Sequence, residues 1–321
     1  MTLTVRIPLV GALMALVLSA GAAFAQYPNR PIRLILPYNP GGIVDYVGRA
    51  LAQHLGEALG QTVVPENRPG AGGILGTEVT ARASPDGYTL LLMDNAIVIN
   101  PSLQQHVPYD LKQLDPISWV SSSPLLLVVP PALNVKTLDT FIAYAKANPG
   151  KLNFATAGVG TAPHLAAELF KQHTGITATH VPYKGIGAFY IDLMSNKIQF
   201  SFSSIAGAIG FTGDKRVLAL ATTGETRSEL YPYAPTMTEA GLNFSVDLWL
   251  ALFAPAGMPA DVKTKLTKAV QTVAGKSAFK AQLAHIGATP RGTPPAETAA
   301  FIKTEYAKWK QVITDGKIRI D

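Results

Sequence analysis

Two glycine-rich segments lie where a strand pattern gives way to a helix pattern, and both are suited to binding an anion. The first covers residues 37–42 (PYNPGG), with Asp45 shortly after it, and the second covers residues 157–164 (AGVGTAPH). Glycine lets the backbone approach a ligand closely, and the start of a helix offers free N–H groups to negative charge. Each segment therefore predicts a binding site for a carboxylate or a similar group.

Both segments also have a purely structural interpretation. An acidic residue such as Asp45 is favourable in the first turn of any helix, so residues 37–42 are equally compatible with an ordinary turn. Thr161 is a candidate N-cap whose hydroxyl, with the N–H groups of residues 160–162, would hold a carboxylate. His164 either donates to the ligand or bonds within the protein. The two segments facing each other across a cleft would fit a ligand with two polar ends, and this pairing is more specific than either segment alone.

Sequence patterns for other chemistry are poor matches. Residues 70–73 (GAGG) look like a dinucleotide-binding loop, but Leu75 stands where the third glycine of G-x-G-x-x-G is required. The sequence has no P-loop, no G-x-S-x-G elbow, no H-x-x-x-H pair among its six histidines and no cysteine. Neither a cluster of metal ligands nor a pair of catalytic carboxylates stands out. We therefore expect no cofactor, no metal site and no enzymatic activity.

The elements that must position these segments alternate between strands and helices. Short apolar runs predict strands, and apolar residues at helical spacing, such as Val44, Val47 and Leu51, predict helices between them. Continuous apolar strands between helices indicate mostly parallel sheets in an α/β protein. Strands are expected at residues 31–36, 62–65, 88–93, 125–129, 153–156, 180–183, 198–203, 218–222 and 248–254, and helices at 44–59, 138–147, 165–173 and from 259 to the end.

The alternation falls into two blocks that are joined twice by short segments, near residues 121–124 and 245–247. We therefore expect two lobes. Residues 26–123 and 247–321 form the first lobe, and residues 124–246 are inserted between them as the second. Paired connections of this kind make a hinge with a cleft between the lobes.

The first 25 residues predict a secretory signal peptide. Arg6 supplies a positive charge, residues 7–19 are mostly apolar, and residues 23–25 (AFA) form a small-residue cleavage site. The apolar run is short for a membrane span, which needs about 20 residues; a retained membrane anchor is the alternative. We expect cleavage after Ala25 and a secreted protein.

Several segments spread along the chain together resemble one family, the Bug-type receptors, which are the solute-binding components of tripartite tricarboxylate transporters. The resemblance covers nearly the whole chain after the signal peptide, and many motifs in the same order are more specific than one. The segments are residues 27–45 (YPNRPIRLILPYNPGGIVD), 66–73 (ENRPGAGG), 85–91 (PDGYTLL), 100–103 (NPSL), 148–169 (NPGKLNFATAGVGTAPHLAAEL), 180–185 (HVPYKG) and 252–259 (LFAPAGMP).

The resemblance implies a two-lobed periplasmic binding protein fold, in which each lobe is a mostly parallel sheet flanked by helices and the ligand cleft lies between the lobes. It implies ligands that are di- or tricarboxylates, aromatic acids or some amino acids, and membrane permease subunits as partners. The candidate ligand-binding residues are Tyr38, Asn39, Gly41, Gly42 and Asp45 for one end of the ligand, Gly158, Gly160, Thr161 and His164 for the other end, and Asn95, Ala96, Gly185, Ser203 and Ser204 at the borders of the cleft.

One position departs from the family pattern. Family members commonly carry Phe-Asp after the strand near residue 200, whereas here Phe202 is followed by Ser203 and Ser204. Loss of that carboxylate argues against a ligand with an ammonium group, unless Asp94 replaces it. Two serine hydroxyls can bond a neutral or anionic group instead.

Three aromatic residues remain open in their placement. Phe189 and Tyr190 stand where smaller residues are usual in the family, and Trp249 lies near the second crossing between the lobes. If they face the cleft, they favour a ligand with an aromatic or apolar body. A position in the core is the equal alternative.

The leading hypothesis is a periplasmic receptor, a monomer, that closes on a small carboxylate and delivers it to a tripartite transporter. The formal net charge is +6, but the lysines and arginines are scattered, so we expect no binding to nucleic acid. Two alternatives remain: a receptor that reports its ligand to a signalling partner, and a secreted α/β hydrolase with His164 or Asp45 as its base.

Overall fold

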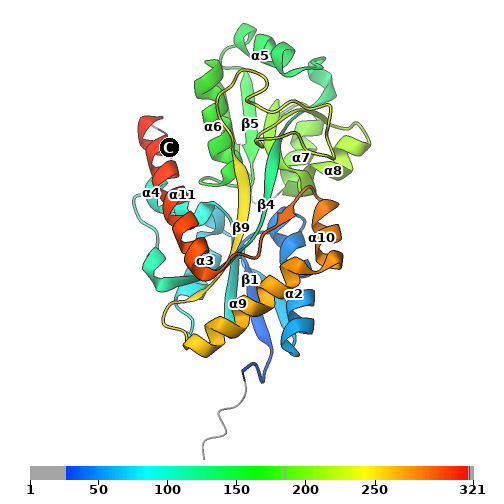
Figure 1. The fold of residues 1–321 in the computed structure, drawn as a ribbon. Helices are drawn as coiled ribbons and strands as arrows, with labels where there is room; N and C mark the ends of the chain where they lie inside the picture. Colours follow the sequence, from blue (N-terminus) through cyan, green and yellow to red (C-terminus); the bar gives the residue numbers. More distant parts are fainter. Residues whose placement is uncertain (1–26, 184–185, 317, 319–321) are drawn as a thin grey trace, which may run out of the picture.

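The computed structural model describes residues 27–183, 186–316 and 318. The expected signal peptide, residues 1–25, its cleavage site and the candidate residue Gly185 lie outside the described residues. Within the described part of the chain, no helix has both the length and the apolar character that a membrane span requires. Figure 1 shows an elongated molecule of two lobes, with long strands running between them.

The first lobe is built on three parallel strands, β1 (Ile32–Leu36), β2 (Val63–Asn67) and β3 (Thr89–Met93), in the order β2-β1-β3. All five residues of β3 are buried, as expected for a continuous apolar strand inside a parallel sheet. Helix α2 (Ile43–Leu59) packs against α9 (Ala260–Gly275) and α10 (Ser277–Ala284). The other helices of this lobe are α3 (Ile74–Ala81), α4 (Ala96–Leu103) and α11 (Pro295–Asp315).

The second lobe repeats this plan. Its parallel strands are β5 (Leu152–Thr156), β6 (Ala178–Pro182) and β7 (Phe200–Ser204), in the order β7-β5-β6. The helices of this lobe are α5 (Leu138–Ala147), α6 (Ala162–Thr174), α7 (Ile186–Met194) and α8 (Ile205–Gly213). The α/β fold with mostly parallel strands in each lobe is therefore confirmed.

Two long antiparallel strands join the lobes. β4 (Leu114–Val129) pairs with β9 (Asp247–Pro255) through its first part, and then with β7 and β8 (Leu218–Thr222) through residues 125–129. Figure 1 shows both strands passing between the lobes. The connection expected at residues 121–124 is thus not a short linker but the middle of β4, because pairing with β9 extends this strand on both sides.

The C-terminal region differs from the continuous helix expected after residue 259. A short strand, β10 (Thr289–Pro290), pairs with β4 and separates α10 from α11. Glu305 of α11 accepts hydrogen bonds from the indole N–H groups of Trp249 (2.8 Å) and Trp309 (2.9 Å), and all three side chains are buried. The bond from Trp249 connects α11 to β9, so the chain returns to the first lobe after crossing twice.

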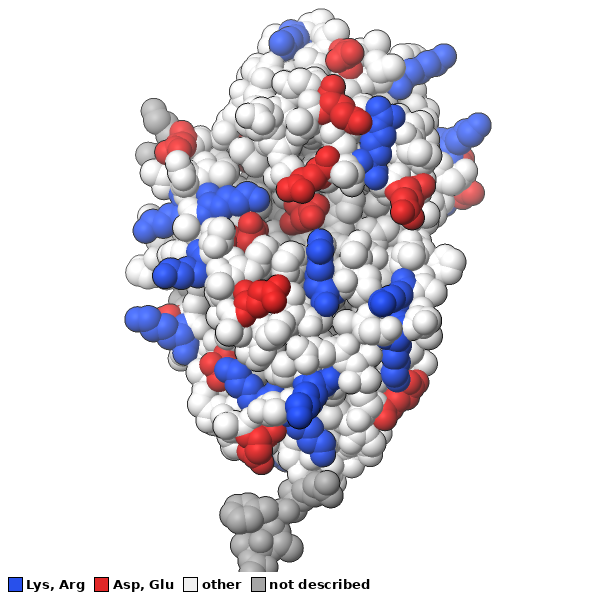
Figure 2. All heavy atoms as spheres, viewed as in Figure 1, with Lys and Arg blue, Asp and Glu red and all other residues white. Residues whose placement is uncertain are grey.

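Three short 3₁₀ helices complete the structure at Ala71–Gly73, Leu111–Gln113 and Pro131–Leu133. The surface carries charges of both signs: on the face shown in Figure 2, lysines and arginines are interspersed with aspartates and glutamates. The described residues of that face show no large area of one charge.

Candidate functional site

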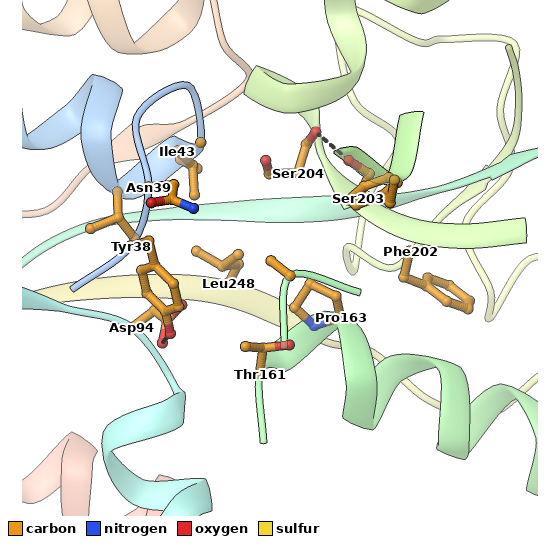
Figure 3. Close-up of a pocket in the computed structure, with 14 residues that line it drawn as sticks. Tyr38, Asn39, Ile43, Asp94, Thr161, Pro163, Phe202, Ser203, Ser204 and Leu248 are labelled. Carbon is orange, nitrogen blue, oxygen red and sulfur yellow. Dashed lines mark hydrogen bonds between the residues drawn. The ribbon is translucent and has the colours of Figure 1, made fainter. Parts of the chain in front are cut away.

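A cavity lies between the lobes, at the carboxyl ends of β1 and β3 on one side and of β5 and β7 on the other (Figure 3). This is where open parallel sheets bind ligands. The enclosed space measures about 60 Å³, which is room for a few water molecules. The described residues that line it are Tyr38, Asn39, Gly42, Ile43, Val44, Asp94, Ala157, Thr161, Pro163, Phe189, Phe202, Ser203, Ser204 and Leu248.

On the first lobe, the loop between β1 and α2 brings the start of a helix to the cavity. Gly42 occupies the N-cap position in an extended conformation, and no side chain caps the helix. Since Gly42, Ile43 and Val44 line the cavity, backbone N–H groups at this helix start can bind an anion there.

Asp45 stabilises the loop between β1 and α2 through hydrogen bonds. Its carboxylate accepts hydrogen bonds from the Gly41 N–H (3.2 Å), the Arg49 guanidinium (2.9 Å) and the Asn67 amide (3.1 Å). Although burial raises the pKa of Asp45, these three bonds lower it below its ordinary value. Gly41 and Asp45 line a different hollow, which Arg49 and Ala206 also border, so the structure gives them a role in loop geometry and places them outside the cavity.

On the second lobe, the loop between β5 and α6 presents a second helix start. Thr161 occupies the N-cap position, as expected, but its hydroxyl makes no capping bond and instead donates to the Gly158 carbonyl oxygen at 2.8 Å. Thr161 and Pro163 line the cavity. Two helices without side-chain caps, one from each lobe, therefore begin at the same cavity.

The carboxyl end of β7 supplies hydroxyl groups. Ser203 accepts a hydrogen bond from the buried Tyr190 hydroxyl at 2.8 Å, and Ser204 caps α8 by accepting from the Gly207 N–H at 3.3 Å. Phe189 lines the cavity directly, whereas Tyr190 lies behind Ser203. The cavity wall here is thus both apolar and able to form hydrogen bonds.

An acidic residue lies at the opposite wall. The Tyr38 hydroxyl and the Ala96 N–H both donate to Oδ1 of Asp94, each at 2.9 Å. Burial raises the pKa of Asp94 to about 6, while the bonds from Ala96 and Tyr38 lower it. Figure 3 shows Tyr38 and Asp94 side by side at one edge of the cavity, away from Ser203 and Ser204.

A larger groove adjoins the cavity. It has a volume of about 760 Å³ and shares Tyr38, Asn39 and Ala157 with the cavity. Its walls include Gly158 and the 3₁₀ helix Ala71–Gly73. A ligand too large for the inner space would therefore extend past Tyr38 into this groove.

His164 is held within the second lobe. Its Nδ1 accepts a hydrogen bond from the Gly160 N–H at 3.4 Å, and its ring stacks on His180 with a centroid distance of 4.2 Å. Burial, with the nearby charges of His180 and Lys171, lowers the pKa of His164 to about 3. His164 is therefore a neutral histidine that packs against other rings within the second lobe, away from the cavity. This is the structural alternative considered for this residue in the sequence analysis.

Three further residues expected near the cleft have structural contacts. Asn95 donates to the Asp247 carbonyl oxygen (3.0 Å) and accepts from the Trp249 N–H (3.1 Å), so it ties α4 to β9. The Ala96 N–H binds Asp94 as described above. Trp249 is buried against α11 and does not line the cavity.

Of the candidate residues, the structure brings Tyr38, Asn39, Gly42, Thr161, Ser203 and Ser204 together around the cavity, with Gly158 at the adjoining groove. Sequence reasoning did not select several apolar neighbours. Two of them lie inside a predicted segment and three lie within two residues of a selected residue, but Leu248 gave no signal. These are Ile43, Val44, Ala157, Pro163, Phe202 and Leu248.

The fold and the cavity define a class: a two-lobed solute-binding protein. A family model described as tripartite tricarboxylate transporter family receptor matches residues 47–318. The protein BugT of Bordetella pertussis is 37% identical over 306 residues, which cover 93% of each chain. The chain belongs to this family of receptors, which is the family that the sequence motifs indicated.

Two solved structures extend the comparison. The periplasmic binding protein BugD is 31% identical, with a TM-score of 0.87 over 91% of this chain and 99% of that chain. Rpa4515 of R. palustris, solved with adipate, is 29% identical, with a TM-score of 0.88 over the same shares of the two chains. The chain therefore has the two-lobed fold of periplasmic solute-binding proteins.

Proposed function

We propose that this protein captures a small carboxylate in the periplasm by closing its lobes and delivers it to the permease of a tripartite transporter. The observation that carries the proposal is the meeting of two helix starts without side-chain caps, those of α2 and α6, at one cavity. Backbone N–H groups at helix starts bind carboxylates without a cationic side chain. The hydroxyls of Thr161, Ser203 and Ser204 add further hydrogen-bonding groups.

The proposed lobes are residues 26–123 with 247–321, and residues 124–246. Closure would bend β4 and β9, the two strands that run between the lobes. A ligand that contacts both lobes at once favours the closed form, because it gains contacts there that the open form lacks. We propose that the protein acts as a monomer, since each chain supplies both walls of its own cavity.

We infer that the protein is a receptor and not a hydrolase. Among the described cavity residues, the Ser203 hydroxyl contacts Tyr190 and the Ser204 hydroxyl contacts the start of α8. Neither serine has a described contact with a histidine or carboxylate that would activate it as a nucleophile. Of the two bases considered for catalysis, His164 faces the interior of the second lobe, and Asp45 binds Arg49 and Asn67 outside the cavity.

The proposal is tested by thermal unfolding of ligand-free protein with a panel of mono- and dicarboxylic acids. A ligand at about 100 times its Kd stabilises the folded state by about 2.7 kcal/mol. For a protein of this size we expect the Tm to rise by roughly 5 °C or more with at least one acid. The primary amide of the same acid, which has a similar shape without the charge, should give no rise. Absence of any rise, together with chemical conversion of one of the acids, would contradict the proposal.

A further inference from the structure

We propose that Asp94 makes the cavity selective for an acid with one carboxylate and a separate hydrogen-bond donor, a hydroxyl or an ammonium, over a dicarboxylate. This inference rests on the proposed function, because it assumes that the cavity binds a carboxylate. The proposed function concerns the carboxylate of the ligand, whereas this inference concerns its second polar group, the donor that binds Asp94.

The geometry leaves Asp94 able to accept a hydrogen bond from a ligand. The residue is only 4% exposed and lines the cavity at the end of β3. Its hydrogen bonds from the Tyr38 hydroxyl and the Ala96 N–H both reach Oδ1, and Oδ2 takes part in neither. A carboxylate has about four acceptor positions over its two oxygens, so a donor in the cavity can still bind Asp94.

The charge of Asp94 opposes a second carboxylate. Among the described residues that line the cavity, Asp94 and Tyr38 are the ionisable ones, and none is a lysine, arginine or histidine. At pH 7.5 the Asp94 carboxyl is mostly ionised in a poorly solvated position, where like charges repel strongly. A ligand hydroxyl or ammonium at this place would instead form a charge-assisted hydrogen bond.

The two walls then define the orientation of the ligand. In Figure 3, Ser203 and Ser204 lie together on one side, Asp94 lies beside Tyr38 on another, and Ile43 lies next to Asn39. The ligand carboxylate is placed at the serines and at the start of α2, and the donor is placed at Asp94. Side chains of Phe189, Phe202 and Leu248 provide apolar wall for the body of the ligand between these ends.

The test is calorimetric titration of ligand-free protein at pH 7.5 with two matched series. One series is butanoate, 4-hydroxybutanoate, 4-aminobutanoate and butanedioate; the other is benzoate, 4-hydroxybenzoate, 4-(aminomethyl)benzoate and benzene-1,4-dicarboxylate. We expect at least one donor-bearing acid to bind about tenfold or more tightly than the diacid of its series. The hydroxyl and amino members show which donor Asp94 accepts.

The variant Asp94→Asn should reduce this preference at least tenfold, because it removes the charge but keeps an oxygen that accepts from Tyr38 and Ala96. The matched control is Asp214→Asn, an exposed carboxylate that pairs with Arg216 outside the cavity; it should leave the preference unchanged. Diacids that bind the wild type as tightly as the donor-bearing acids would overturn the inference, even if the Asp94 variant failed to fold. Equal preference in wild type and Asp94→Asn would also overturn it. Failure of every acid to bind would reject the proposed function as well.

Discussion

At the scale of single residues, the cavity places one carboxylate where water hardly reaches it. Asp94 is buried at the end of β3, and burial raises its pKa from 3.8 to about 6. The titratable groups that face it are Tyr38 and Tyr109, whose own pKa values are raised above 10, with burial the main cause. Both tyrosines are therefore neutral below pH 8, and a titration of this region near pH 6 belongs to Asp94.

This shift predicts a measurable effect on stability. Below pH 3.8 the carboxyl is protonated in both folded and unfolded chains, so its burial has no ionisation cost. As the pH rises from 3.8 to about 6, Asp94 ionises in the unfolded chain but stays protonated in the folded chain, which destabilises the folded state by about 3 kcal/mol in total. The variant Asp94→Asn lacks this cost, so its stability relative to the wild type should increase between pH 4 and pH 7.

Urea unfolding of ligand-free wild type and Asp94→Asn at a series of pH values measures this difference directly, since other titrating groups cancel. The exposed-site variant Asp214→Asn serves as control and should show no such trend. A stability difference between wild type and Asp94→Asn that stays constant from pH 4 to pH 7 would show that the pKa of Asp94 is not raised in the folded protein.

At the scale of elements, residues 70–73 of the first lobe and the loop before α6 of the second lobe approach each other closely. The Asn100 amide donates to the Gly72 carbonyl oxygen at 3.1 Å. A Cβ on Gly72 would collide with the Val159 carbonyl oxygen, and a Cβ on Gly160 would collide with the Asn100 amide oxygen. The first lobe thus meets the second through two glycines whose positive φ and close neighbours disfavour a side chain.

We therefore predict that Gly160→Ala holds the lobes apart and weakens binding of the best acid in the panel about tenfold, or ~1.4 kcal/mol. Gly150→Ala is the matched control, because Gly150 has nearly the same φ (+73° against +75°) but nothing within 4 Å of the added carbon. The strain of a positive φ is shared by both variants. Titration calorimetry compares them, and equal affinity of the two variants would exclude a role for this contact in closure.

The elements around the cavity were predictable from sequence to different degrees. Strands such as β3 are continuous apolar runs bounded by polar turns, so both their position and their burial were predicted. Helices α3, α4, α7 and α8 were not predicted, because each has only eight or nine residues and contains glycine or proline. Short helices of this kind are stabilised by packing and by neighbouring strands, which a local pattern does not reveal.

The sequence motifs identified the loops that reach the cavity, but they did not identify which residues of those loops line it. The loops before α2 and α6 both reach the cavity, yet Asp45 and His164 point away from it. Asp45 binds Arg49 and Asn67, and His164 stacks on His180. Asn67 and His180 belong to other strands, β2 and β6, so only the folded structure distinguishes a ligand-binding residue from one that shapes its own loop.

At the scale of the whole molecule, two similar α/β lobes share a sheet through β4 and β9 and enclose a cavity at their facing strand ends. This arrangement suits a protein that binds by closing, because its contacts to the ligand are divided between parts that can move relative to each other.

The central claim, a receptor that retains a small acid between its lobes, is tested most directly by native mass spectrometry of protein purified from the periplasm without denaturation. We expect a species heavier than the bare chain by the mass of one small carboxylic acid, which is released on unfolding and binds again to the refolded protein. A retained molecule without an acidic group, or a refolded protein that binds none of the acids offered, would contradict the account.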